Sequence, residues 1–259
     1  MANALIGGLV SRGYDARSIC VIEISPAARE RIAAHGAHVS TAPGAASEKA
    51  DTLVLAVKPQ DARAALASVA STVKGKLVIS ICAGLRLAAL SRWLNGHRGL
   101  VRCMPNTPAL VGAGIAGLYA LPEVTGTERQ RAERILSAVG EVVWVNDEAL
   151  LDTVTAVSGS GPAYVFWLIE QLAAFAERAG IGSAEALKLA THTVLGSAKL
   201  AAQSGEPPAT LRAKVTSKGG TTEAALKTLE QEQLAERFAR ALAAATRRGH
   251  ELGDELAKD

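Results

Sequence analysis

"ANALIGGLVSRGYDARSICVIEI" (residues 2–24) decides the fold of the first half of the chain. Apolar residues from Leu5 to Val10 recur at helical spacing, and Gly13 stands where a C-terminal helix cap is expected. The β-branched run "SICVIEI" (18–24) then predicts a strand. A helix followed by a strand is the second half of a βαβ unit. We therefore expect that the strand which should precede this helix has been left off.

The pattern of alternation continues to about residue 150. Short apolar runs predict buried strands at 51–57, 76–82, 99–104 and 141–145. Helical segments are expected at 25–36, 61–73, 86–94 and 127–140, the first capped by Ser25 and the last opened by the capping box "TERQ" (127–130). Strands buried on both faces and alternating with helices predict an α/β domain, a doubly wound parallel sheet with its first strand missing.

The second half of the chain has a different pattern, with helices and no strands. Helical periodicity covers 160–180, 183–204, 208–215 and 222–258. The helix that contains Tyr164, Phe166, Trp167 and Leu172 is apolar on nearly every side, and such a helix must be buried on every side. We therefore predict a domain at 1–150 followed by an all-helical domain at 151–259 that interlocks with a second copy.

Composition and charge exclude several classes of function. A net charge of +3 with no basic run argues against nucleic-acid binding. The first ten residues make a poor signal peptide, and the longest apolar helix is interrupted by Glu170 and Gln171, so no membrane span is expected. Three cysteines without zinc spacing and five scattered histidines predict no metal site. We expect a cytoplasmic protein.

"GAGIAG" (112–117) fits the spacing of a dinucleotide-binding turn but not its context. That turn follows a strand and opens a helix, because the helix N-terminus must face the pyrophosphate. Here the motif follows the loop-like "MPNTPAL" and precedes "LYALPE". We interpret it as a glycine-rich turn before a short edge strand. The phosphate-binding turn is expected instead just ahead of Met1.

Three strand ends are expected to converge on one crevice, because ligands of open α/β sheets bind at the carboxyl ends of the strands. "AVKPQ" (56–60) places Lys58 at one end, where a lysine must reach solvent or an anion. "ICAG" (81–84) offers small residues that let a planar ring approach the backbone. "RCMPNTPALVGAG" (102–114) places Asn106 and Thr107 in a proline-braced loop.

A glycine-bearing turn in the helical half, "VTSKGGTTEAAL" (215–226), precedes another predicted helix. The amides of residues 219–222 would form a positive pocket for a small carboxylate, to which Thr222 adds a hydroxyl. Ordinary helix capping by glycine and threonine is the alternative interpretation of this turn. "VSGSGPAYVF" (157–166) is a second polar turn between apolar helices.

Taken together, "AVKPQ", "MPNTPALVGAG", "AVSGSGPAYVF" and "VTSKGGTTEAAL" closely resemble the motifs of Δ1-pyrroline-5-carboxylate reductases, in order and spacing. The resemblance runs from Met1 to the C-terminal helix. It implies a Rossmann-like dinucleotide-binding domain and a helical dimerisation domain, with dimers that can gather into decamers. It also implies reduction of 1-pyrroline-5-carboxylate to L-proline by hydride transfer from NADPH or NADH. Family chains begin with a strand and a glycine-rich turn, whose last residue falls on Met1 here.

The resemblance also implies site residues. Cofactor contacts would be made by Ser25, Ala56, Val57, Lys58, Pro59, Ile81, Cys82, Ala83 and Gly84. Substrate contacts would be made by Asn106, Ser217, Gly219, Gly220, Thr221 and Thr222, with Thr222 as the catalytic residue. The chain departs from the family pattern at Lys218, where proline is usual, and at Pro43–Gly44, near which asparagine is common. The substrate turn is therefore expected to be less rigid.

Residues at the end of the 18–24 strand give mixed signals about the cofactor. Glu23 argues against the 2′-phosphate of NADPH, whereas Ser25 and Arg29 argue for it, and we favour NADPH with NADH as the alternative. Two rival functions remain. One is another imine reductase or a β-hydroxyacid dehydrogenase, the latter disfavoured by "SKGGTT". The other is a non-catalytic dimer whose cofactor site was lost with the first strand.

Overall fold

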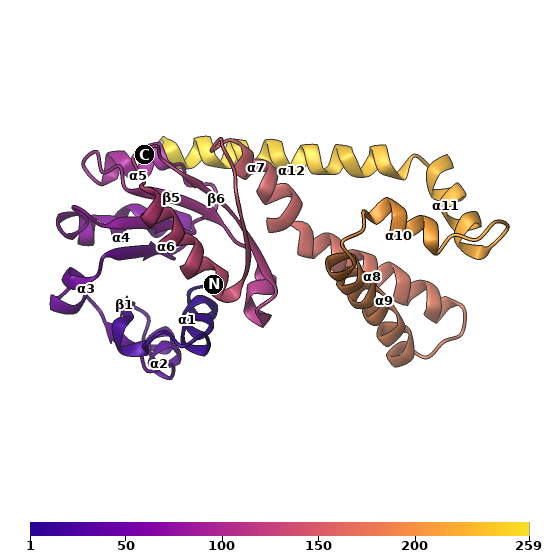
Figure 1. Cartoon of the computed structure of the whole chain (residues 1–259), viewed down its shortest axis with the longest axis horizontal. Coiled ribbons are helices and arrows are strands. Elements are labelled where there is room, and N and C mark those ends of the chain that lie inside the picture. The colour runs from indigo at the N-terminus through magenta and orange to yellow at the C-terminus, as the bar shows by residue number, and fades with distance from the viewer. Residues whose placement is uncertain (259) are drawn as a thin grey trace. The chain divides into compact units, whose positions relative to one another are not determined.

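The computed structural model describes residues 1–258 and divides into two compact units (Figure 1). The first unit is Met1–Ser160 together with the segment from Ala245, and the second is Gly161–Ala244. The predicted boundary lies at residue 150, whereas the first compact unit extends to Ser160 and also includes the segment from Ala245. The division into functional domains stays a prediction.

The first unit alternates helices and strands. Its main elements are α1 (Ala2–Ser11), β1 (Cys20–Ile22), α2 (Pro26–Ala33), β2 (His38–Ser40), α3 (Ala45–Lys49), β3 (Thr52–Leu55), α4 (Ala62–Val69), β4 (Leu77–Ser80), α5 (Leu87–Trp93), β5 (Leu100–Met104), β6 (Gly114–Ala120), α6 (Gly126–Leu136), β7 (Gly140–Trp144) and α7 (Leu150–Val154). A π-helical turn, η6 (Thr155–Gly159), follows α7. The second unit is helical, with α8 (Gly161–Arg178), α9 (Ser183–Ser204), α10 (Pro208–Lys214), α11 (Thr221–Gln231) and the start of α12 (Leu234–Ala257).

The strands of the first unit form two sheets. A five-stranded sheet has the order β3-β4-β5-β6-β7, and β1 pairs with β2 in a parallel sheet of their own. No ladder joins β1 to β3 anywhere in residues 1–258, so each of these two strands has an unpaired edge. The five-stranded sheet is parallel except where β6 runs antiparallel to β5.

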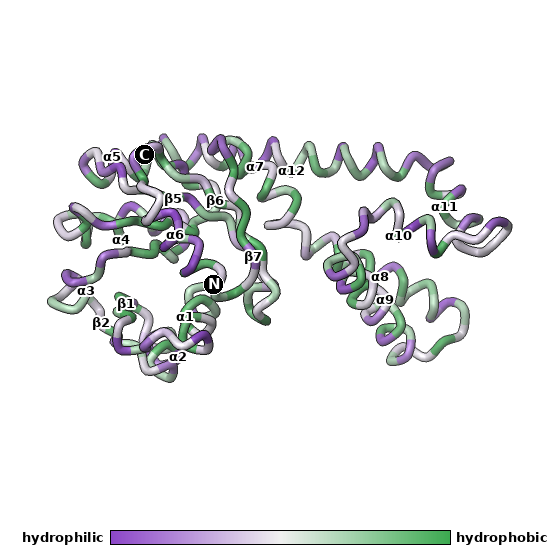
Figure 2. Tube along the Cα trace, in the orientation of Figure 1, coloured by the Kyte–Doolittle hydropathy of each residue, from purple (hydrophilic) through white to green (hydrophobic). Residues whose placement is uncertain are grey.

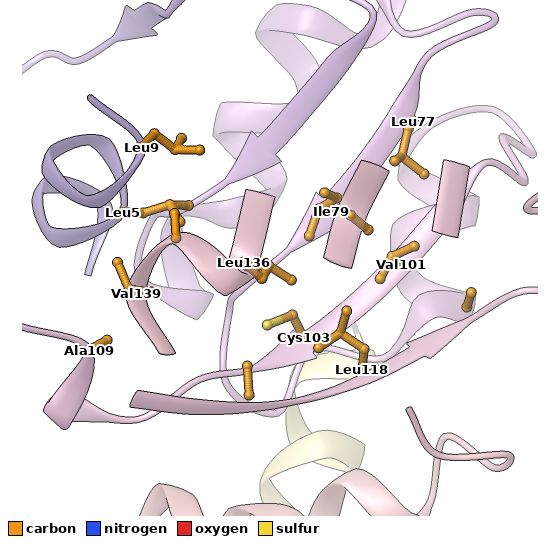
Figure 3. Packing of buried hydrophobic residues seen from close by; sticks show 14 of the residues in the cluster. Leu5, Leu9, Leu77, Ile79, Val101, Cys103, Ala109, Leu118, Leu136 and Val139 are labelled. Atoms are coloured by element: carbon orange, nitrogen blue, oxygen red, sulfur yellow. The ribbon is translucent and has the colours of Figure 1, made fainter. Parts of the chain in front are cut away.

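Helices cover both faces of the five-stranded sheet. Alternate residues of its strands therefore join different hydrophobic clusters, one on each face. Leu77 and Ile79 of β4 join a cluster with Leu5 and Leu9 of α1 (Figure 3). Val78, between them, joins the cluster built on α4 and α5. Strands apolar on both faces must be covered on both. The prediction of a doubly wound sheet is confirmed.

Two local predictions about glycine and capping residues are wrong. Gly114 and Gly117 do not form a turn before an edge strand; both lie within β6, an interior strand between β5 and β7. A Cβ on Gly117 would come within 2.7 Å of Val154, so this glycine serves close packing. The capping box of α6 uses Thr125 and Glu128 rather than "TERQ", because the helix begins earlier, at Gly126. Gly13 after α1 and Ser25 before α2 occupy the predicted cap positions.

The second unit has only a small buried core. Ala173 of α8 with Ala186 and Ala190 of α9 are its buried apolar residues. Apolar stretches of α8 and α9 (green in Figure 2) are instead exposed in this chain, with Phe166 60%, Trp167 57% and Phe175 69% accessible. The predicted helix that is apolar on nearly every side is confirmed as α8, and much of its surface lacks a partner within Gly161–Ala244.

Candidate active site

The carboxyl ends of β3 and β4 lie side by side in parallel register. Ala56–Pro59 follow β3, and Ile81–Gly84 follow β4. The thiol of Cys82 donates to the carbonyl oxygen of Val57 at 3.2 Å and so ties the two ends together. Burial raises the pKa of this thiol, and only 2% of the residue is exposed, so its backbone alone could touch a ligand. Lys58 is exposed and forms no ion pair within residues 1–258.

The carboxyl end of β1 carries the residues predicted at the adenosine end of a cofactor. Ser25 caps α2 by accepting a hydrogen bond from the Ala28 amide at 3.4 Å. Its own amide donates to Oε1 of Glu23 at 2.8 Å. The guanidinium of Arg29 donates to the carbonyl oxygens of Glu23 and Ile24, at 3.2 and 2.7 Å. The turn after β1 is therefore held by its own side chains.

These residues fit a nicotinamide dinucleotide. The first turn of α1 has no side-chain cap, so its amides point out with the positive end of the helix dipole, as pyrophosphate binding requires. Ala83 and Gly84 have little or no side chain, and Gly84 has φ +74°, a conformation that suits glycine. Small residues at a strand end allow a flat ring to approach the backbone. A carboxylate oxygen of Glu23 remains to bind a ribose hydroxyl.

Asn106 lies at the end of β5 with its side-chain amide already bonded at both ends. Its nitrogen donates to the carbonyl oxygen of Ser158 at 3.2 Å, and its oxygen accepts from the Ile115 amide at 3.0 Å. It is 9% exposed. Asn106 therefore holds the π-helical turn η6 against the start of β6. Its predicted contact with substrate stays a prediction.

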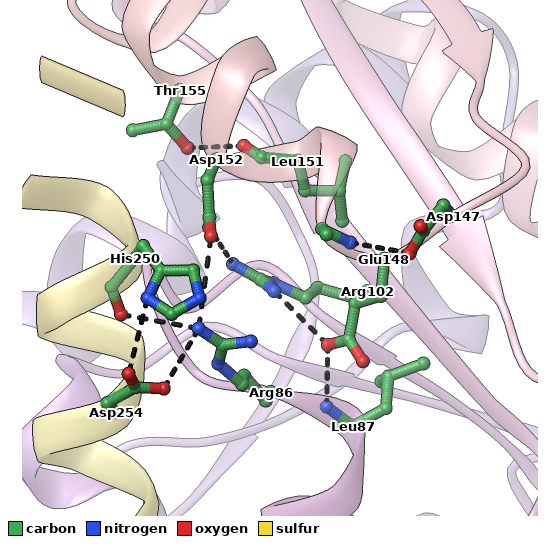
Figure 4. A network of polar contacts seen from close by, with 11 residues as sticks. Arg86, Leu87, Arg102, Asp147, Glu148, Leu151, Asp152, Thr155, His250 and Asp254 are labelled. Carbon is green, nitrogen blue, oxygen red and sulfur yellow. Dashed lines mark hydrogen bonds and ion pairs between the residues drawn. The ribbon is translucent and has the colours of Figure 1, made fainter. Parts of the chain in front are cut away.

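A buried ionic network supports this end of the first unit (Figure 4). Arg102 of β5, 3% exposed, pairs with Glu148 at 3.1 Å and with Asp152 of α7 at 3.4 Å. Arg86 reaches Asp254 of α12 at 3.0 Å. These pairs explain why α7 and the segment from Ala245 belong with the first unit. The sequence offered one signal that we missed: an arginine inside the apolar run "GLVRCM" needs buried acidic partners.

The predicted substrate turn, Ser217–Thr222, lies in the second unit at the start of α11. Gly220 is the N-cap, and its amide donates to the Ser217 carbonyl at 3.0 Å. A Cβ on Gly220 would come within 2.5 Å of the Ser217 hydroxyl oxygen, so a larger residue there would make the Ser217 side chain move. Gly219, at φ +72°, donates its amide to Oε2 of Glu223 at 2.6 Å. A carboxylate of the chain itself thus occupies one of the amides expected to bind substrate.

Within residues 1–258 Thr222, like its neighbour Thr221, has a hydroxyl without a hydrogen-bond partner, whereas Thr216 and Thr228 on either side do not. Thr216 and Thr228 donate to the backbone carbonyls of Arg212 and Ala224, four residues earlier in each case. The hydroxyl of Thr222 makes no hydrogen bond with any described residue, although the side chain is half-buried. Thr222 thus presents a free donor and acceptor beside the glycine turn.

The described residues contain no group of three or more His, Cys, Asp and Glu side chains placed to hold a metal ion. None of the helices in residues 1–258 is both long enough and apolar enough to cross a membrane.

Comparisons with known proteins match both parts of the chain. Residues 148–252 match a family described as "Pyrroline-5-carboxylate reductase dimerisation", and residues 1–84 match "NADP oxidoreductase coenzyme F420-dependent". The chain is 42% identical to the pyrroline-5-carboxylate reductase of Pseudomonas aeruginosa, over 99% of this chain and 94% of that protein. It is also 42% identical to the Synechocystis enzyme of that name, over 98% of this chain and 95% of that one.

Solved structures that resemble this chain include members of the same family. A pyrroline-5-carboxylate reductase from Coxiella burnetii superposes with a TM-score of 0.93 at 38% identity, over 97% of this chain and 94% of that one. A Plasmodium falciparum pyrroline carboxylate reductase with NADP bound superposes with a TM-score of 0.83 at 27% identity, over 96% of this chain and 93% of that one. A Streptomyces aurantiacus imine reductase shares the fold alone. It is 16% identical, with a TM-score of 0.56 over 96% of this chain and 91% of that one.

Proposed function

Because this chain belongs to the pyrroline-5-carboxylate reductase family, and so reduces 1-pyrroline-5-carboxylate to L-proline with NAD(P)H, we propose roles for its own residues in that reaction. The observation that carries the function is 42% identity over 99% of the chain. When bound, the cofactor supplies a hydride to the carbon of the cyclic C=N bond. The protein must bind and orient both molecules, and it must hold the substrate carboxylate and ring nitrogen.

The turn Ser217–Thr222 is the proposed substrate site. Thr221 contributes an open backbone amide at the positive end of α11, which suits a carboxylate, and Gly219 adds a second amide when Glu223 moves away. Gly220 closes the turn through its amide bond to Ser217. The free hydroxyl of Thr222 suits the ring nitrogen, so Thr222 is the proposed catalytic residue. Ser217 shapes the turn through its carbonyl. Because the imine carbon is already electrophilic, orientation supplies much of the rate enhancement.

The strand ends of the first unit are the proposed cofactor site. Ser25 would lie at the adenosine end, with Ala56–Pro59 along the dinucleotide and Ile81–Gly84 at the nicotinamide. The small side chains at Ala83 and Gly84 and the uncapped first turn of α1 support the proposal. Asn106 acts by holding η6 through Ser158, and its contact with substrate is part of the proposal.

A homodimer is the proposed assembly, and decamers built from such dimers are its extension. The exposed apolar surface of α8 and α9 supports the dimer, since the most exposed side chains there are large aromatic residues. The family description of residues 148–252 as a dimerisation region supports it as well. We also propose a cytoplasmic location, because the three cysteines are free thiols, as is usual in a reducing compartment. That the protein has no nucleic-acid or membrane partner stays a prediction from the sequence.

A substrate panel tests the proposed function. The full chain is incubated with NADH or NADPH and 1-pyrroline-5-carboxylate, an acyclic imine or a β-keto acid, while nicotinamide absorbance is followed. We expect consumption with 1-pyrroline-5-carboxylate and accumulation of L-proline, identified by chiral chromatography. Faster turnover of the acyclic imine or the keto acid would show instead that the chain is a different reductase.

A further inference from the structure

Contrary to the preference for NADPH expected from the sequence, we propose that Glu23 determines cofactor specificity at the adenosine ribose and makes NADH the tighter of the two ligands, with NADPH still usable. This inference rests on the proposed cofactor site. It concerns the one chemical difference between the dinucleotides, a 2′-hydroxyl in NADH and a 2′-phosphate in NADPH. The residues that decide between them lie just past the carboxyl end of the strand β1.

Glu23 is fixed at this position by backbone and side-chain bonds. Its amide donates to the Ser40 carbonyl at 2.9 Å, which extends the pairing of β1 with β2 by one residue. Oε1 accepts the Ser25 amide at 2.8 Å. The carboxylate therefore has a set orientation at the strand end, and its other oxygen, Oε2, has no hydrogen-bond partner in residues 1–258. A free carboxylate oxygen is the acceptor that a ribose hydroxyl needs.

The charge of Glu23 is not neutralised by a neighbouring cation. No Lys, Arg or His nitrogen within residues 1–258 lies within 4.0 Å of this carboxylate. Arg29 is the nearby arginine that could neutralise it, yet its Nη1 is bonded to the Glu23 and Ile24 carbonyls rather than to the carboxylate. An unpaired carboxylate repels a phosphate dianion, and like charges brought together are costly.

The loop after β2 offers little to offset that repulsion. The Ser40 hydroxyl donates to the Ala42 carbonyl at 2.8 Å, and the Ser47 hydroxyl donates to the Gly44 carbonyl at 2.8 Å. Pro43 and Gly44 have no side-chain donor. Ser25, the exposed Thr41 hydroxyl and the remaining N–H groups of Arg29 are left to bind a 2′-phosphate, which is why NADPH is weakened rather than excluded.

Equilibrium binding tests the proposal without relying on turnover. NADH and NADPH are titrated separately against the full chain, and Kd is read from nicotinamide fluorescence. Two variants are compared with the natural chain. Glu23→Gln removes the charge but keeps an oxygen to accept the Ser25 amide. Glu30→Gln removes an exposed charge of α2 as the matched control.

We expect NADH to bind about tenfold more tightly than NADPH, and added salt to narrow that gap because it screens the repulsion. Glu23→Gln should tighten NADPH about tenfold and weaken NADH, while Glu30→Gln leaves the ratio unchanged. A chain that binds NADPH as tightly as NADH, or a ratio unmoved by Glu23→Gln, overturns the specificity role and leaves the cofactor site intact. Failure to bind either dinucleotide overturns the cofactor site itself, and the role of Glu23 with it.

Discussion

The amide of Gly219 donates to the Glu223 carboxylate at 2.6 Å, so the turn proposed to bind the substrate carboxylate already holds one from its own helix. The carboxylates of Glu223 and of the substrate would both be stabilised by the same positive N-terminus of α11. Substrate must displace Glu223 or bind the remaining amides beside its negative charge. The relationship makes Glu223 a competitor in the site, a role that no motif indicated.

Glu223→Gln should therefore lower KM for 1-pyrroline-5-carboxylate. The expected change is about two- to fivefold, the range for an exposed charge, with kcat little affected. Steady-state kinetics give the answer. Glu230→Gln, an exposed charge further along α11, is the control and should change neither constant. A raised KM in Glu223→Gln would mean that the carboxylate supports the turn instead of competing with substrate.

Thr222→Ala should lower kcat/KM by about 10²-fold while leaving the melting temperature unchanged. The estimate is that for one hydrogen bond to the reacting group. Folding should be unaffected because the Thr222 hydroxyl bonds no described residue. Thr228→Ala is the matched control, since that hydroxyl donates to the Ala224 carbonyl. Thr222→Ser should restore much of the activity. Near-normal kinetics in Thr222→Ala would remove the residue from the catalytic site.

Arg102→Met should destabilise the fold by about 3–5 kcal/mol, because buried Asp152 loses its hydrogen-bonded cation and keeps only the longer contact with Arg86, at 3.9 Å. Asp152 is 4% exposed, and its Oδ2 already lacks a hydrogen-bond partner. Arg98→Met breaks an exposed pair with Glu123 and should cost below about 1 kcal/mol. Urea unfolding of both variants measures the difference. Equal costs would show that the buried network contributes no more than a surface pair.

Phe166→Glu should turn the proposed dimer into a monomer, since it places a charge in the exposed aromatic surface of α8. Equilibrium sedimentation at micromolar concentration distinguishes the two states. The control is Glu170→Gln, a polar substitution on the same helix, which should leave the dimer intact. A monomer in the natural chain, or an unchanged assembly in Phe166→Glu, would contradict a dimer built through α8.

Much of the fold was predictable because it depends on local patterns. Ser25 caps α2 and Gly13 follows α1 because such positions require those residue types. The buried strands β3, β4 and β5 are apolar runs, and the glycine turn before α11 is visible as a motif.

Features set by distant contacts were not predictable. β2 has three residues, too few for a periodic signal, and its pairing with β1 creates it. β6 contains two glycines, which disfavour strands, but Gly117 lets Val154 pack closely against it. In the candidate site, the motif located Gly219 and Thr222, whereas the bonds of Glu223 and Asn106 depend on three-dimensional geometry.

The most direct measurement of the central claim follows the hydride itself. The full chain is supplied with 1-pyrroline-5-carboxylate and a nicotinamide cofactor deuterated at the transferred position, and the product is examined by mass spectrometry and NMR. Hydride transfer to the C=N carbon predicts L-proline with one deuterium on the ring carbon beside nitrogen. Proline without deuterium, or no proline while the cofactor stays reduced, would contradict the account.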